Sequence, residues 1–264
     1  MAKTRLDALL AERGLYESRS RAAAAVLAGE VRVEQPGDGL PKPGQMVAAD
    51  VDVQVERGPS FVSRGGLKLA NGLDALRLEP AGRRCLDVGA STGGFTDCLL
   101  ARGAESAVAV DVAYGELSWR LRGDPRVTVL ERTNARSLRP ELLPYVPDLA
   151  VVDVSFISLA KVLGPTIRCL GARSDVLALV KPQFELGRER VGRGGVVRAA
   201  GDRREALVAV ARYARDEFAC AVLGFASSSL PGPAGNRESF VWLGERGRAG
   251  DVADLEAAAR SAEP

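Results

Sequence analysis

The stretch from Arg84 to Asp97 constrains the fold of this chain more than any other. Cys85 to Val88 is a short apolar run broken only by Asp87, which predicts a buried parallel strand. A turn with three glycines follows, and apolar residues then recur at helical spacing from Phe95. A strand, a Gly-rich turn and a helix in this order let a ligand approach the backbone at the carboxyl end of a sheet strand.

The spacing of this turn argues against two common ligands and favours a third. No Lys follows Gly94, as a P-loop requires, and the glycine order does not match the dinucleotide fingerprint. S-Adenosylmethionine fits better, because Asp87 and Asp111 are acidic and Asp111 ends a second apolar run, where it can accept hydrogen bonds from a ribose diol. NAD-binding proteins also carry a strand-end acid, so these acids alone do not separate the two cofactors. Besides the two acids, we expect S-adenosylmethionine, the donor, to contact Asp153 and the residues of the turn, which are Gly89, Ala90, Ser91, Thr92, Gly93, Gly94, Phe95 and Thr96.

Residues 89–93 also match G-x-S-x-G, the nucleophile elbow of serine hydrolases. That chemistry normally needs a His base, and the chain has no His. We therefore interpret Ser91 as part of the loop geometry. The absence of His, with four widely spaced Cys, also predicts no metal site and buried free thiols in a reducing compartment. No apolar run reaches the roughly 18 residues of a membrane span and no signal peptide is visible, so we expect a cytoplasmic protein without a membrane partner.

The chain of 264 residues has room for one large domain and one small one. We predict a small domain at 1–57, a linker at 58–63 with Phe61 packing between the domains, and a larger domain at 64–264. In the small domain, Leu6, Leu9 and Leu10 form one helical face, and Ser18 caps a second helix that Gly29 ends. Short extended segments follow at 31–33 and 47–55.

The larger domain alternates predicted strands and helices, which favours a doubly wound, mostly parallel sheet of seven strands. Beyond the first unit, the predicted strands are 107–111, 127–131, 149–154, 176–180, 221–226 and 240–243, and the predicted helices are 94–102, 116–122, 158–170, 203–218 and 251–260. Residues 183–204 form the exception, because they are long, Gly-rich and rich in arginine. We expect a mobile arm that binds RNA phosphates, with disorder as the alternative.

Four charged residues occupy positions where an open α/β sheet places its active site. Asp153 and Lys181 end two predicted strands, Lys68 opens the helix before the first strand, and Glu238 precedes the last strand. For each residue taken alone, a solvated strand-end charge is the simpler interpretation. Together, beside a donor-binding turn, they indicate a catalytic group.

Two lysines and two carboxylates suit methylation of a ribose 2′-hydroxyl, which must lose its proton as it attacks a sulfonium methyl. A lysine base must be neutral, whereas a free lysine has a pKa of about 10.4; a nearby cation and burial both lower such a pKa. We assign Lys181 as the general base and Lys68 as the neighbouring cation. Asp153 and Glu238 orient the ammonium groups and the hydroxyl, and alignment of oxygen, methyl and sulfur supplies the remaining acceleration.

The N-terminal pattern R-L-D-x-L-L-x-x-R-G-L-x-x-S-R-x-x-A, then A-G-x-V-x-V and K-P-G, resembles the S4-like RNA-binding domain. The net charge of +2 does not by itself indicate nucleic acid, and charge alone favours solvated arginines. The resemblance implies phosphate contacts from the helical arginines. With the arginines of the later segments, the expected RNA-binding residues are Arg5, Arg13, Arg19, Arg21, Arg64, Arg188, Arg190, Arg193 and Arg198.

Over nearly its whole length the chain resembles the TlyA family of ribosomal-RNA 2′-O-methyltransferases, also called haemolysin A. The motifs are V-S-R-G-G-L-K-L (62–69), D-V-G-A-S-T-G-G-F-T-D (87–97), T-N-A-R (133–136), D-V-S-F-I-S (153–158), L-V-K-P-Q-F-E (179–185), G-G-V-V-R (194–198) and G-N-R-E-S (235–239). The resemblance implies a Rossmann-like methyltransferase domain, S-adenosylmethionine as the donor and cytidine 2′-hydroxyls of 16S or 23S ribosomal RNA, or of both, as acceptors. It also implies a Lys68–Asp153–Lys181–Glu238 tetrad, Asn134 and Ala135 near the adenosine, and an effect on capreomycin susceptibility.

Three other functions stay open on the sequence. Asp153 to Phe156 lies where base N-methylating enzymes carry a D-P-P-Y-like motif, although an exocyclic amine does not need two lysines. A haemolysin or membrane-active protein is a second alternative, for which no long cationic amphipathic segment is visible. A ribosome-assembly factor without catalysis is the third. We expect a monomer that binds ribosomal RNA or ribosomal subunits.

Overall fold

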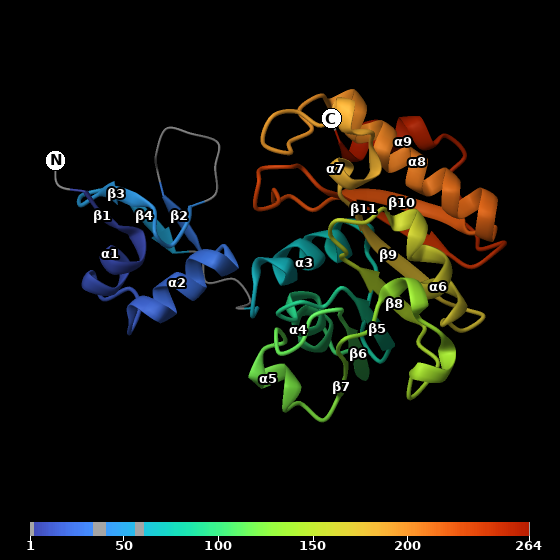
Figure 1. The fold of residues 1–264 in the computed structure, drawn as a ribbon, viewed down its shortest axis with the longest axis horizontal. Helices are drawn as coiled ribbons and strands as arrows, with labels where there is room; N and C mark the ends of the chain where they lie inside the picture. The colour runs from blue at the N-terminus through green and yellow to red at the C-terminus, as the bar shows by residue number, and fades with distance from the viewer. Residues whose placement is uncertain (1–2, 34–40, 56–60, 264) are drawn as a thin grey trace.

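The computed structural model describes residues 3–33, 41–55 and 61–263, which form a small N-terminal lobe and a larger lobe (Figure 1). Residues 34–40, between the predicted extended segments, and 58–60 of the expected linker lie outside these ranges. The small lobe has a hydrophobic core of its own, separate from those of the larger lobe. Phe61 is buried beside Leu69 and Phe95 in a core of the larger lobe, so it does not pack between domains as expected.

In the small lobe, two helices pack on two short antiparallel ribbons. β1 (Lys3–Arg5) pairs with β3 (Met46–Ala48), and β2 (Val31–Val33) pairs with β4 (Val53–Val55). The predicted helices are α1 (Leu6–Glu12) and α2 (Arg19–Ala28). Ser18 Oγ accepts from Arg21 N at 3.2 Å, and Gly29 ends α2 with φ 81°, as the cap residues predict. The sequence did not indicate β1, because Lys3, Thr4 and Arg5 include no apolar residue that could alternate with polar ones.

The larger lobe is built on the predicted seven-stranded sheet. Its strands are β5 (Arg84–Val88), β6 (Ser106–Val110), β7 (Val127–Leu130), β8 (Leu149–Val152), β9 (Asp175–Val180), β10 (Ala221–Ser227) and β11 (Ser239–Gly244). Their order is β10-β11-β9-β8-β5-β6-β7, and among these described strands only β11 runs opposite to the others. The order reverses beside β5, which is where such sheets bind ligands.

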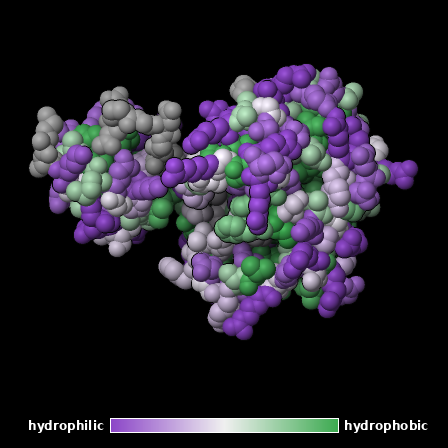
Figure 2. Space-filling model, turned by 45° about the horizontal axis from the view of Figure 1, so that its top comes forward, coloured by the Kyte–Doolittle hydropathy of each residue, from purple (hydrophilic) through white to green (hydrophobic). Residues whose placement is uncertain are grey.

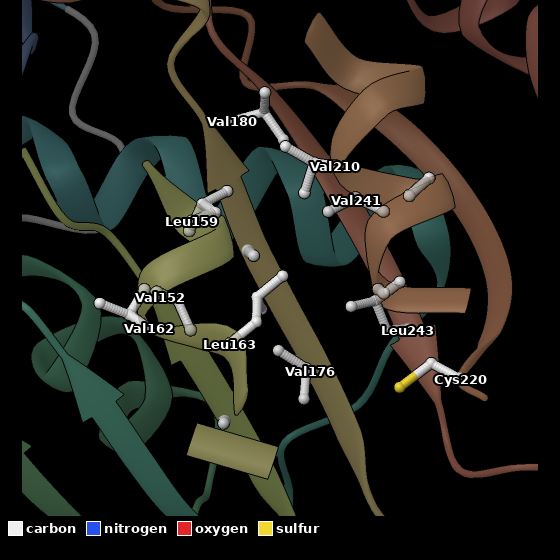
Figure 3. Close-up of a cluster of buried hydrophobic side chains, with 14 of the residues drawn as sticks. Val152, Leu159, Val162, Leu163, Val176, Val180, Val210, Cys220, Val241 and Leu243 are labelled. Carbon is white, nitrogen blue, oxygen red and sulfur yellow. The ribbon is translucent and has the colours of Figure 1, made fainter. Parts of the chain in front are cut away.

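Helices cover both faces of the sheet. α3 (Arg64–Leu76), α4 (Gly94–Ala101) and α5 (Trp119–Arg122) lie with one hydrophobic cluster, and α6 (Leu163–Arg168), α8 (Ala200–Phe218) and α9 (Leu255–Ala262) lie with the other. Figure 3 shows the second cluster, in which Val152, Val176 and Leu243 of the strands meet Leu163 and Val210 of the helices. Successive strand residues alternate between the clusters, as the two-residue period of a strand requires.

Three helices differ from their predictions. The helix expected over 158–170 is divided into a 3₁₀ turn, Leu159–Lys161, and α6, because Pro165 cannot donate a main-chain hydrogen bond and suits only the first turn of a helix. The last helix, α9, begins later than expected because Asp254 caps it, accepting from Ala257 N at 2.9 Å. α5 is reduced to a single turn.

The arginine-rich segment is not the long free arm that the sequence suggested. It contains α7 (Pro182–Glu185) and a 3₁₀ turn, Arg188–Arg190, and α8 begins within it. Glu185 accepts from Ser158 Oγ at 2.7 Å and from Leu159 N at 2.9 Å, and Arg190 pairs with Glu205 at 2.6 Å. These contacts hold the segment against the larger lobe.

Hydrophilic side chains cover much of the face of the larger lobe shown in Figure 2, with hydrophobic patches between them. Throughout the described ranges, no helix combines the length and the apolar character needed to cross a membrane.

Candidate active site

The carboxyl ends of β5, β6 and β8 open onto a cavity of about 540 Å³. Its lining includes six of the residues that the sequence predicted for the donor, namely Gly89, Ser91, Asp111, Asn134, Ala135 and Asp153. Its volume is within the usual range for a small-molecule site. The predicted cofactor turn therefore borders the cavity at Gly89 and Ser91.

Gly89 brings the ends of β5 and β8 together. Its φ is 89°, and a Cβ at this position would overlap the main-chain oxygen of Asp153. The N–H of Asp153 in turn donates to Val88 O at 2.9 Å. A side chain at 89 would therefore separate Asp153 from the turn, which is the physical reason for a glycine here.

Asp111 binds the turn with one carboxylate oxygen and its own loop with the other. Its Oδ2 accepts from Ser91 N at 2.7 Å, and its Oδ1 accepts from Ala113 N at 2.8 Å. Ser91 has φ 48°, a strained backbone conformation that nucleophile elbows share. Here that conformation directs the N–H of Ser91 toward Asp111, in agreement with the interpretation of Ser91 as loop geometry.

Asp87 lies fully buried beneath the turn. Its Oδ2 accepts from the N and Oγ1 of Thr96, at 2.8 Å and 2.6 Å, and its Oδ1 has no hydrogen-bond partner among the described residues. Burial is the main cause that raises the pKa of this carboxyl to about 7; the negative charges of Asp153 and Asp111 add to it, and the bonds from Thr96 oppose it. Asp87 and Thr96 therefore fix the start of α4 from below and do not line the cavity.

The remaining residues predicted for the donor also lie outside the cavity lining. A Cβ on Gly93 would overlap the side chain of Leu121, and one on Gly94 would overlap Ser63 Oγ, so both glycines face protein. Phe95 is buried in the core. Together with Ala90 and Thr92 these residues shape the turn, and their contact with the donor stays a prediction.

The four charged residues form two ion pairs at the same edge of the sheet. Lys181 Nζ lies 2.6 Å from Asp153 Oδ1, and Lys68 Nζ lies 2.5 Å from Glu238 Oε2. Ser239 of β11 stands opposite Val180 of β9, so Glu238 and Lys181 flank this pair at one end of the two strands. Lys68 and Glu238 are almost completely buried.

The position of Lys68 depends on how closely α3 approaches the sheet. A Cβ on Gly72 would lie 2.6 Å from the ring of Phe240 in β11, so only a glycine permits this approach. Asn71 Nδ2 also donates to Ser228 O at 3.0 Å. These contacts hold α3 against the segments on either side of Glu238.

Phe156 is a further residue at the site that the sequence did not single out. Its side chain is 91% exposed, it lines the cavity three residues after Asp153, and its φ is 63°. Its ring centroid lies 5.2 Å from that of Phe184. A bulky residue held at positive φ is uncommon and points to function, and the signal in the sequence was an aromatic residue in a polar loop after a strand.

The arginines expected to bind RNA fall into two groups. In the first group, each arginine already has a partner within the protein. Arg5 and Arg19 pair with Asp7, Arg21 lies 4.0 Å from Glu17, Arg13 donates to Ala49 O and Val51 O at 2.8 Å, and Arg190 pairs with Glu205. The second group has no side-chain ion pair within the described ranges and consists of Arg64, Arg188, Arg193 and Arg198.

The cavity suits a partly apolar ligand that carries both positive and negative groups. Its acids are Asp111 and Asp153, its cations are Arg136 and Lys161, and Ile157 and Val162 supply apolar wall. All four Cys residues are buried free thiols, as expected, and across the described residues no group of three or more His, Cys, Asp or Glu could hold a metal ion.

The sheet order, the cavity at its switch point and the two ion pairs beside it define a Rossmann-type methyltransferase. The sequence model of the FtsJ-like methyltransferases matches residues 61–245.

More specific relatives cover nearly the whole chain. The 16S/23S rRNA (cytidine-2′-O)-methyltransferase TlyA of Mycobacterium tuberculosis strain H37Rv is 50% identical over 245 residues, which are 91% of this chain and 90% of its own. YqxC of Bacillus subtilis, named as an rRNA methyltransferase, is 43% identical over 92% of this chain and 87% of its own. A solved structure from Streptococcus thermophilus, under the name of a hemolysin, has a TM-score of 0.75 at 37% identity, covering 99% of this chain and 96% of that one. The chain belongs to the TlyA family of FtsJ-like rRNA methyltransferases.

Proposed function

We propose that this protein transfers a methyl group from S-adenosylmethionine to the 2′-hydroxyl of a cytidine in ribosomal RNA. One observation carries the proposal: Lys181 is paired with Asp153, and Asp153 lines the cavity that suits the donor. A potential proton acceptor therefore lies at the rim of a donor site. The assignment of cytidine follows the names of the relatives.

When bound, the donor supplies an electrophilic methyl on its sulfonium. Gly89, Asp111 and Asn134 line the cavity where its adenosine and amino-acid parts would lie. The acceptor 2′-oxygen forms a bond to the methyl carbon as the carbon–sulfur bond breaks, which leaves S-adenosylhomocysteine. The hydroxyl proton passes to the neutral amine of Lys181, which becomes an ammonium.

The two ion pairs support different tasks for the two lysines. Lys181 Nζ also donates to Ser155 Oγ at 2.8 Å. Its partner Asp153 lines the cavity, so Lys181 lies next to the donor site. Lys68 is buried against Glu238, so it acts as a fixed positive charge beside the site. Asp153 and Glu238 hold the two ammonium groups in place, which pre-organises the site for the acceptor.

The small lobe is proposed to bind structured RNA and thereby to deliver the acceptor. Arg5, Arg19 and Arg21 lie on or beside α1 and α2 and are at least half exposed. Contacts from such arginines to phosphates fix position without reading the base. We further propose a domain boundary within the linker at 58–63 and, from the substrate of the protein, a cytoplasmic location.

The decisive experiment incubates the protein with separated 16S- and 23S-containing subunits and labelled S-adenosylmethionine, and maps 2′-O-methyl groups on each RNA. We expect nuclease-resistant 2′-O-methyl dinucleotides that contain cytidine. Label on a base nitrogen would support N-methylation. Binding of subunits without any label would support an assembly factor, and lysis of red cells that survives Lys181→Ala would support a haemolysin.

A further inference from the structure

A second cavity, of about 570 Å³, opens on the other side of the ion pairs. It is lined by Glu238, by residues 196–198 and by the loop that joins β10 to β11. The first cavity is lined by Asp153 and this one by Glu238, so each cavity borders one of the two ion pairs. A group held in the second cavity is therefore adjacent to the reacting centre while leaving the donor site free.

The walls of the second cavity are fixed by Asn236, whose side chain is buried. Asn236 Oδ1 accepts from Val197 N at 2.9 Å, and its Nδ2 donates to Gly195 O at 2.8 Å. Its main-chain oxygen accepts from Gly232 N at 2.8 Å. These bonds join the arginine-rich segment and the β10–β11 loop into one continuous wall of the cavity.

The lining carries an excess of positive charge. Arg203 is neutralised by Glu263, with Nε 2.6 Å from Oε1, and donates from its Nη1 to Arg198 O. Arg198 and Arg237 are exposed and have no ion pair within the described ranges. The acid in the lining, Glu238, is already paired with Lys68. Two guanidinium groups are therefore available to an anionic ligand.

We propose that this second cavity binds the backbone phosphate of a nucleotide next to the one that is methylated, through Arg198 and Arg237. The inference rests on the proposed function, because a ribose placed at the ion pairs carries phosphates on its neighbouring oxygens. Guanidinium groups donate paired hydrogen bonds to phosphate oxygens. Such contacts position the acceptor strand without reading its sequence.

The proposal separates this cavity from recognition by the small lobe. Phosphates bound in the small lobe would hold the RNA far from the reacting atoms. A phosphate beside Glu238 would instead fix the position of the 2′-oxygen relative to the methyl group of the donor. Loss of the second contact should therefore raise the KM for RNA and also lower kcat, because misplacement of the acceptor weakens alignment. Donor affinity should not change, because neither arginine lines the first cavity.

The test compares the double variant Arg198→Ala/Arg237→Ala with Arg246→Ala in the full-length protein. Arg246 is also exposed and unpaired within the described ranges, but it follows β11 at the opposite end of the sheet. We expect the double variant to bind ribosomal RNA roughly tenfold or more weakly, since hydrogen bonds to charged groups are strong. Its plot of log affinity against log salt should be shallower by about 0.7, the value for one single-stranded phosphate contact.

Restoring the charge with Arg198→Lys/Arg237→Lys should recover most of the salt dependence. The inference is overturned if the double variant matches Arg246→Ala in both RNA affinity and salt slope. Because RNA binding is measured without methyl transfer, this result is distinct from failure of the proposed function, in which the wild-type protein binds RNA but places no label on a 2′-oxygen.

Discussion

Lys181 Nζ lies 2.6 Å from Asp153 Oδ1 and 2.8 Å from Ser155 Oγ, so the ammonium is held between two oxygens of the segment that follows β8. A general base must be unprotonated when the acceptor hydroxyl gives up its proton. A substitution can therefore keep the positive charge at position 181 while removing its ability to accept a proton.

Lys181→Arg should abolish methyl transfer, although it keeps the positive charge beside Asp153. Arginine remains protonated at all accessible pH values and cannot accept the hydroxyl proton. A loss of about 10²-fold or more in kcat is expected, in the range of general-base catalysis. Donor binding, measured by calorimetry, should stay within a few-fold of wild type. Turnover of the Lys181→Arg variant at the wild-type rate would remove Lys181 from the base role.

Phe156→Ala should weaken use of the RNA more than binding of the donor. An exposed ring at the rim of the cavity is suited to stack on a base that has left its helix, and such stacking contributes about 1–3 kcal/mol. We therefore expect a rise of about tenfold or more in the KM for RNA, measured in steady state. Phe156→Trp supplies the matched control, because it keeps an aromatic face; equal losses in the two variants would contradict stacking.

Asp87→Asn should change how stability depends on pH. The folded pKa of Asp87 is raised to about 7, against about 3.9 in an unfolded chain, so between these values only the folded protein holds the proton. The free energy of unfolding therefore falls as pH rises from about 4 to about 7 and does not change further above that range. Urea titrations across this window should show a shallower decline for the variant.

Asp124→Asn serves as the control for that experiment. The pKa of Asp124 is lowered to about 2, first by its side-chain hydrogen bond with Arg126. Its contribution is present above the unfolded pKa and is lost as pH falls toward about 2, so its removal should leave the decline between about pH 4 and 7 unchanged. Parallel curves for Asp87→Asn and wild type would refute the raised pKa.

Removal of residues 1–60 should leave a folded domain that binds the donor and methylates ribosomal RNA poorly. The small lobe has its own core of Leu6, Leu10 and Val47, whereas Phe61 packs with the larger lobe. Heat-capacity scans and donor titrations should therefore resemble those of the full chain, while the KM for RNA rises. Wild-type activity of the truncated protein would show that the small lobe is dispensable.

Much of the site could be predicted, because it depends on the local backbone conformation of a few residues. The turn after β5, the acid after β6 and the caps at Ser18 and Gly29 depend on local conformation, so composition and spacing were enough to place them. The split of the helix over 158–170 followed from Pro165 and could have been anticipated. By contrast, the difference between lining the cavity and supporting it, as for Ser91 and Asp87, depends on which way each side chain faces in the packed turn.

By itself the sequence determined the alternation of strands and helices, the donor turn and the identity of the four charged residues, because hydrophobic period and turn chemistry are local properties of the chain. Only the tertiary structure decided which lysine pairs with which acid, that Asn236 joins two distant loops, and that Phe156 stands exposed beside Asp153. The reason is physical, because these relationships join residues up to 170 positions apart in the sequence. They exist only after the strands have assembled into the sheet, which brings their ends to one edge.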